Sequence, residues 1–79
     1  MRIPQPLAMS SKAMLAKRLK RLRIDRGLSQ GDLAAKSGTR QALVSAIESG
    51  TANPTLESLE KLAVALRVRL WDLFVPPEE

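Results

Sequence analysis

The apolar residues of this chain recur at helical spacing in several separate stretches. Leu15, Leu19 and Leu22 stand at i, i+4 and i+7, which places them on one face of a helix. A clearer stripe lies further along the chain and consists of Leu56, Leu59, Leu62, Ala63 and Leu66. No stretch alternates apolar and polar residues with the period of a strand. The pattern predicts an all-α fold of five short helices.

The first helix is expected to follow an extended arm. Residues 1–9 contain two prolines, which disfavour helix in the residues before them, and show no apolar period. Ser10 or Ser11 can then cap a helix that runs to about Arg26, where Gly27 follows as a stop.

A capping box marks the start of the second helix, and a third helix follows closely. Ser29 and Asp32 stand three residues apart as the hydroxyl and the acid of a capping box, so a second helix should begin here. It runs to about Ser37, and Gly38 can take the left-handed conformation that ends it. A third helix is expected at about residues 41–49.

The C-terminal part of the chain contains the remaining two helices. Thr55 can cap the fourth, and residues 70–74 can form a short fifth helix before two consecutive prolines end regular structure. We therefore expect one domain at residues 10–75, preceded by the arm at residues 1–9 and followed by a tail at residues 76–79.

Composition excludes most kinds of catalysis. The 79 residues include no Cys and no His, which removes disulfides, thiolate or imidazole metal sites and Ser-His nucleophile pairs. The acidic residues of the fourth helix look like its solvated side. We expect neither an enzyme nor a bound metal or cofactor. No apolar run is long enough for a signal-peptide core or a membrane span, so a cytoplasmic protein is expected.

Charge is distributed unevenly along the chain. Residues 1–40 carry ten basic and two acidic side chains, whereas residues 41–79 carry three basic and six acidic ones. On the first helix, Lys17, Lys20 and Arg21 lie opposite the leucine stripe and should face solvent. A basic half of this kind favours a polyanionic partner, although a merely solvated helix surface remains an alternative.

The second and third helices have the form of a helix-turn-helix. A tight turn with Gly38 joins them, and the second helix of such a pair enters the DNA major groove. Ala34 is small enough for the two helices to cross closely, while Val44 and Ile47 can hold the third helix on the core.

Over residues 15–74 the sequence resembles the lambda-repressor and Cro-like (XRE) family of helix-turn-helix proteins. The residues that carry the resemblance are Leu28-Ser29-Gln30, Asp32-Leu33-Ala34, Gly38, Val44-Ser45, Ile47-Glu48, Gly50, Asn53-Pro54-Thr55-Leu56 and Leu73-Phe74. The resemblance implies an operator-binding regulator. This chain departs from the family pattern where Arg40 replaces a capping Ser or Thr, and where Arg67 and Arg69 replace a Gly and a capping Ser.

The resemblance implies that Gln30 and Gln41 cooperate on phosphate and base. A glutamine amide matches adenine N6 and N7, a contact worth about 1–3 kcal/mol of discrimination. Small side chains on the outward face of the third helix permit close approach, so the predicted base-reading residues are Gln41, Ala42 and Ser45. The alternative is that these residues are only solvated. Phosphate-contacting or positioning roles are expected for Gln30, Arg40, Arg23, Ser49, Thr51 and Asn53.

Arg23 flanks the leucine stripe, where a half-buried guanidinium would need a carboxylate. The resemblance supplies Glu48, so we expect a partly buried Arg23–Glu48 ion pair. One recognition helix makes too few base contacts to select a single site in a genome. Selection therefore requires a dimer with two such helices and a palindromic site. The apolar segment with Trp71, Leu73 and Phe74 is the expected dimer interface, although Trp71 could instead belong to the core.

These observations predict a dimeric, sequence-specific DNA-binding regulator, most simply a repressor of its own or a neighbouring operon. The alternative is a protein-interaction module that keeps the fold, such as the antitoxin of a toxin–antitoxin pair.

Overall fold

The structure, a computed structural model, describes residues 10–75. This part of the chain forms four α-helices and one 3-10 helix, with no strand: α1 (Ser11–Asp25), α2 (Gln30–Ser37), α3 (Gln41–Glu48), α4 (Leu56–Leu66) and η1 (Leu70–Phe74). The all-α prediction is confirmed, but the expected fifth helix is a 3-10 helix. The predicted arm at residues 1–9 and tail at residues 76–79 lie outside the described residues. None of the described helices is long and apolar enough to cross a membrane.

The helices begin at the predicted capping residues. Ser10, rather than Ser11, caps α1, because its Oγ accepts a hydrogen bond from the Ala13 N–H at 3.1 Å. At the start of α2, the Asp32 N–H donates to Ser29 Oγ and the Ser29 N–H donates to the Asp32 carboxylate, both at 2.9 Å. Thr55 caps α4 through its hydroxyl. Side chains therefore satisfy backbone donors that a helix start would leave unpaired.

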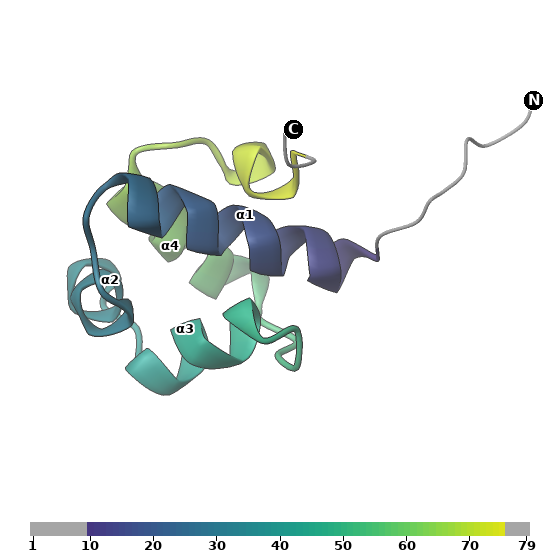
Figure 1. The fold of residues 1–79 in the computed structure, drawn as a ribbon, viewed down its shortest axis with the longest axis horizontal. Helices are drawn as coiled ribbons and strands as arrows, with labels where there is room; N and C mark the ends of the chain where they lie inside the picture. The colour runs from purple at the N-terminus through teal and green to yellow at the C-terminus, as the bar shows by residue number, and fades with distance from the viewer. Residues whose placement is uncertain (1–9, 76–79) are drawn as a thin grey trace, which may run out of the picture.

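The core is built around α1. Figure 1 shows α1 crossing the molecule with α3 on one side and η1 on the other, and α4 behind it. One apolar stripe from each helix points inward, and the largest fully buried side chains are Leu19, Leu33, Ile47, Leu62, Leu66, Leu73 and Val44. Burying each such side chain contributes about 1.5–3 kcal/mol. The α2–α3 pair is thus fixed on a support made by α1 and α4.

Arg18 of α1 and Arg26, which caps its C-terminal end, hold the C-terminal elements in place. Arg18 Nε donates to the Asp72 carbonyl at 2.8 Å, and Arg26 Nε donates to the Leu66 carbonyl at 2.8 Å. Both bonds satisfy carbonyls at or near helix ends, where intrahelical donors are missing. These contacts were not predicted, because their partners are backbone atoms that the sequence pattern does not reveal.

The structure corrects one residue of the predicted dimer interface. Leu73 is fully buried in the core of the protomer, so it has no surface to offer a partner. Phe74 is half-buried and packs against the same core, whereas the Trp71 side chain is 64% exposed. Residues two apart lie on different sides of a helix, so η1 turns Leu73 inward and Trp71 outward.

Candidate nucleic-acid interface

The α2–α3 pair has the geometry of a helix-turn-helix. Gly38 ends α2 with φ +72°, and the Thr39 N–H then donates back to the Ala34 carbonyl at 3.0 Å. Val44 and Ile47 are buried, so they lock α3 against the rest of the domain as predicted. The turn and the core contacts together hold α3 at the surface with one side exposed.

The exposed side of α3 carries the three predicted base-reading residues. Gln41, Ala42 and Ser45 are all exposed, whereas Val44 and Ile47 face the core. The structure thus brings the three onto one accessible helix face, which is the arrangement that contact with a groove requires. Their contact with bases stays a prediction.

Behind this face lies a buried ionic network. Arg23 Nε and Nη2 donate to the two carboxylate oxygens of Glu48 at 2.7 and 3.0 Å, and Arg23 Nη1 donates to the Leu28 carbonyl at 2.8 Å. The side chains of Arg23 and Glu48 are only 12% and 5% exposed. The predicted ion pair is confirmed, and it ties the C-terminal end of α3 to α1.

Gln30 belongs to the same network. Its Nε2 donates to Glu48 Oε1 at 3.1 Å, which links the start of α2 to the end of α3. Gln30 and Arg23 were both predicted to contact or position a phosphate, and their hydrogen bonds within the protein bear on those roles. All three guanidinium nitrogens of Arg23 already donate within the protein, so its geometry favours positioning rather than direct phosphate contact.

The network shifts the acid–base equilibria of both partners. Burial raises the pKa of Glu48, but hydrogen bonds from Arg23 and Gln30, with the charges of Arg23 and Lys20, outweigh it and hold the pKa below its usual value. The hydrogen bond to Glu48 raises the pKa of Arg23 further. Both groups therefore stay charged at neutral pH.

Arg40 stands at the start of α3 without capping it. Its side chain is exposed and makes no capping hydrogen bond with the helix. Thr39 does not take over, because its hydroxyl lies 2.8 Å from Ser37 Oγ. The first turn of α3 thus keeps unpaired N–H groups beside an exposed positive charge, a combination that attracts anions.

The remaining predicted phosphate contacts follow α3. Ser49, Thr51 and Asn53 are exposed on this loop. The Ser49 and Thr51 hydroxyls donate to the Ala46 carbonyl at 3.0 and 3.3 Å and lie 3.0 Å from each other. Two of the three side chains thus help to terminate α3, and the structure leaves their contact with DNA a prediction.

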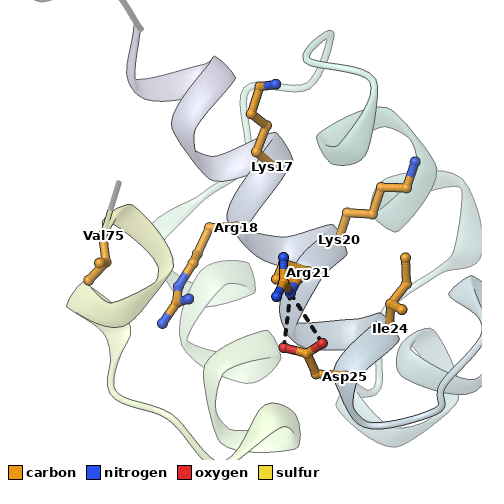
Figure 2. A pocket seen from close by; sticks show the side chains of 7 residues that line it. All are labelled: Lys17, Arg18, Lys20, Arg21, Ile24, Asp25 and Val75. Atoms are coloured by element: carbon orange, nitrogen blue, oxygen red, sulfur yellow. Dashed lines mark hydrogen bonds and ion pairs between the residues drawn. The ribbon is translucent and has the colours of Figure 1, made fainter. Parts of the chain in front are cut away.

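Six basic residues of α1 and of its C-cap position, Arg26, fall into two groups. Arg18, Arg23 and Arg26 donate hydrogen bonds to other parts of the domain. Lys17, Lys20 and Arg21 are exposed, as predicted. Figure 2 shows the two lysines extending from α1 beside an open groove, while Arg21 pairs with Asp25 at 3.2 Å. The positive charge of Lys20 is among the causes that lower the pKa of Glu48.

Comparison with known proteins agrees with this geometry. The helix-turn-helix family HTH_3 matches residues 19–70. A hypothetical transcription factor of Neisseria meningitidis serogroup B is 38% identical over 68 residues, which cover 86% of this chain and 64% of that protein. The crystal structure of the hypothetical transcription factor NHTF from Neisseria has a TM-score of 0.84 at 35% identity, covering 96% of this chain and 90% of that chain.

A second solved structure contains nucleic acid. SinR, a master regulator for biofilm formation, was crystallised in complex with DNA, and it matches with a TM-score of 0.74 at 33% identity, covering 78% of this chain and 100% of that chain. The family match spans more than half of the sequence and includes α2, the turn and α3. The chain therefore belongs to the HTH_3 helix-turn-helix family, the lambda-repressor and Cro-like group that its sequence resembles.

Proposed function

We propose that this protein is a transcriptional regulator that binds double-stranded DNA by placing α3 in the major groove. The observation that carries the proposal is the exposed face of α3 with Gln41, Ala42 and Ser45, held in place from behind by the Arg23–Glu48 pair. A helix with small and amide side chains on its outer face fits closely against base edges. The relatives named as transcription factors support the same role.

Three side chains would read bases. The Gln41 amide has a donor and an acceptor in one plane, which match adenine N7 and N6. The Ala42 methyl can contact a thymine methyl, and the Ser45 hydroxyl can donate or accept. The expected operator therefore contains A·T pairs opposite the start of α3.

Phosphates would be held on both sides of α3. Arg40 provides a positive charge at its start, and Ser49, Thr51 and Asn53 lie exposed after its end. Gln30, at the start of α2 and hydrogen-bonded to Glu48 at the end of α3, is the proposed phosphate contact from α2. Lys20 extends this positive surface onto α1. Such contacts fix the register of α3 on the duplex without reading sequence.

The active form would be a homodimer that binds a palindromic operator. Trp71 is a large apolar side chain that is 64% exposed, and the Arg69 guanidinium lies 5.5 Å from its ring centroid. Large aromatic residues and arginines are both enriched where protein partners meet. Trp71, with Phe74 at its edge, is the proposed contact, and repression of its own or a neighbouring operon is the proposed outcome.

An antitoxin role is not favoured, because the similar proteins described above are named as transcription factors or regulators.

DNA selection followed by binding measurements tests the proposal. A preferred duplex would be selected from random sequences, and fluorescence anisotropy would compare it with a scrambled duplex across salt concentrations. Gln41→Ala should weaken binding to the selected duplex by roughly 5- to 150-fold and leave scrambled binding nearly unchanged. Glu60→Ala, an exposed change on α4, is the matched control. Failure to select any preferred duplex would refute sequence-specific binding.

Sedimentation of Trp71→Ala tests the dimer. A hot-spot contact contributes about 2 kcal/mol or more, so dimer dissociation should increase at least ~30-fold while the protomer remains folded. An unchanged dissociation constant would exclude Trp71 from the interface.

A further inference from the structure

Gly31 differs from the other glycines of the chain. Gly27, Gly38 and Gly50 have positive φ angles, and a Cβ atom at any of them would meet nothing within 4 Å. Gly31 lies inside α2 and lacks a positive φ, so its backbone does not require glycine. Glycine in a helix costs about 0.5–1 kcal/mol relative to alanine. The conformation of the chain therefore gives no reason for a glycine at this position.

The surroundings of Gly31 do give a reason. A Cβ atom at this position would lie 3.3 Å from Gln41 Oε1 and 3.8 Å from Gln41 Cδ. Gln41 opens α3, so its side chain reaches back across the turn onto the first turn of α2. The carbonyl oxygen is its nearest atom to Gly31. A Cβ atom would require Gln41 to shift by a few tenths of an ångström.

The contact at Gly31 affects both polar atoms of the Gln41 amide, because Oε1 is the atom that lies nearest to α2 at this position. The Nε2 amino group is then the part of the amide further from Gly31. A bidentate contact with adenine needs both atoms placed in one plane at hydrogen-bond distance, so a shift of the whole amide would weaken it.

We propose that Gly31 is a specificity-determining positioning residue: its missing side chain leaves the space in which the Gln41 amide rests against α2. This inference rests on the proposed base-reading function of Gln41. Gly31 itself touches no base in this scheme and acts only through Gln41. The larger the side chain at position 31, the further Gln41 is displaced.

A graded pair of substitutions tests this role. Gly31→Ala and Gly31→Leu would be compared by anisotropy on the selected duplex and on duplexes changed at the base pair whose preference Gln41→Ala removes. Selectivity at that pair should fall slightly in Gly31→Ala and by ~10-fold in Gly31→Leu. Lys36→Leu, which adds a leucine to a different side of α2, is the matched control and should retain selectivity.

Two further measurements separate the possible explanations. Urea unfolding should show Gly31→Ala to be at least as stable as the wild type, since alanine favours helix, so lost selectivity would not reflect unfolding. In the Gln41→Ala background, the Gly31 substitutions should cause no further loss. Equal losses in both backgrounds would mean that the new side chain meets DNA directly, and full selectivity in Gly31→Leu would equally overturn the inference. If Gln41→Ala alone keeps wild-type selectivity, the proposed base-reading function fails first.

Discussion

The chain makes the same three-residue turn twice, once between α2 and α3 and once between α4 and η1. The first residue of each turn is left-handed, with φ +72° at Gly38 and φ +61° at Arg67. The N–H of the next residue, Thr39 or Val68, donates to the carbonyl five residues earlier at 3.0 Å in both cases. The same backbone conformation thus forms with two different sequences, although only Gly38, and not Arg67, is of a residue type that favours a left-handed φ.

The two turns lead into helices that are anchored differently. After the first turn, α3 is held by buried apolar residues and by the Glu48 network at its far end. After the second turn, η1 is held by the fully buried Leu73 and by the hydrogen bond from Arg18 to the Asp72 carbonyl. Anchors beyond each turn, rather than the turn residues alone, therefore keep the left-handed conformation in place.

Breaking the ionic anchor should have the largest effect. Glu48→Gln leaves the Arg23 guanidinium buried without its counter-charge, a change expected to lower the free energy of unfolding by about 3–5 kcal/mol. Urea unfolding followed by circular dichroism would measure it. Glu57→Gln, an exposed glutamate on α4, is the control and should change stability by less than about 0.5 kcal/mol. A decrease in the free energy of unfolding of less than about 0.5 kcal/mol in Glu48→Gln would show that the Arg23–Glu48 pair does not stabilise the fold.

The ionic anchor should also make stability depend on pH. The pKa of Glu48 is lower in the folded protein than its ordinary value of 4.5, so its contribution is complete above that value and is lost as pH falls through the folded pKa. Glu48→Gln should therefore flatten the decline of stability in acid. Some decline should remain, because hydrogen bonds from Ser29 lower the pKa of Asp32. An unaltered acid profile would contradict the assignment.

Breaking the apolar anchor should have the next largest effect. Leu73→Ala removes a fully buried side chain of η1 and should lower the free energy of unfolding by about 2–4 kcal/mol. In contrast to Glu48→Gln, the loss should not vary with pH. Trp71→Ala, an exposed neighbour, is the control for protomer stability. Equal losses for Leu73→Ala and Trp71→Ala would mean that η1 packs differently.

The features that could be predicted from the sequence are those that a few neighbouring residues determine. The caps at Ser29 and Thr55 and the stop at Gly38 depend on residues within one helical turn, and all three are confirmed. The Arg23–Glu48 pair was predicted although its members lie 25 positions apart in the sequence. The helical period placed Arg23 in a half-buried position, and the family resemblance supplied Glu48 as its partner.

Other features could not be read from the sequence. A helical period places Trp71 and Leu73 on different sides, but five residues are too few for the sequence to show which side is buried. The contact of Gly31 with Gln41 joins residues on two helices, and its detection requires the angle at which α2 and α3 cross. Long-range packing and backbone partners therefore had to come from the structure.

Exchanging the left-handed residues of the two turns should have smaller and opposite effects. Arg67→Gly relieves the positive φ of a non-glycine residue and should stabilise the protein by about 0.5–1 kcal/mol after the added freedom of the unfolded chain is included. Gly38→Ala should destabilise it by about 1 kcal/mol, through φ alone, because its Cβ would meet nothing within 4 Å. Thermal unfolding would measure both, and shifts of the same sign would contradict the comparison.

The smallest expected effect concerns the last residue of each turn. This residue is an arginine with an extended backbone in both turns, Arg40 in the first and Arg69 in the second. The Asp72 carboxylate accepts a hydrogen bond from the Arg69 N–H at 2.9 Å, whereas no side chain caps the start of α3 at Arg40. Arg40→Ser places a hydroxyl where it can accept from the first turn of α3, so it should stabilise the protein by about 0.5–1 kcal/mol. Arg40→Ala removes the same charge without adding a cap and should give no such gain. Equal stabilities of the two variants would show that the α3 start cannot be capped from this position.

If Arg40 contacts a phosphate, both variants should reduce the salt dependence of DNA binding equally, by about one unit of slope. In that case Arg40→Ser would raise stability and weaken DNA binding, because a cap and a phosphate-binding charge would compete for the same position.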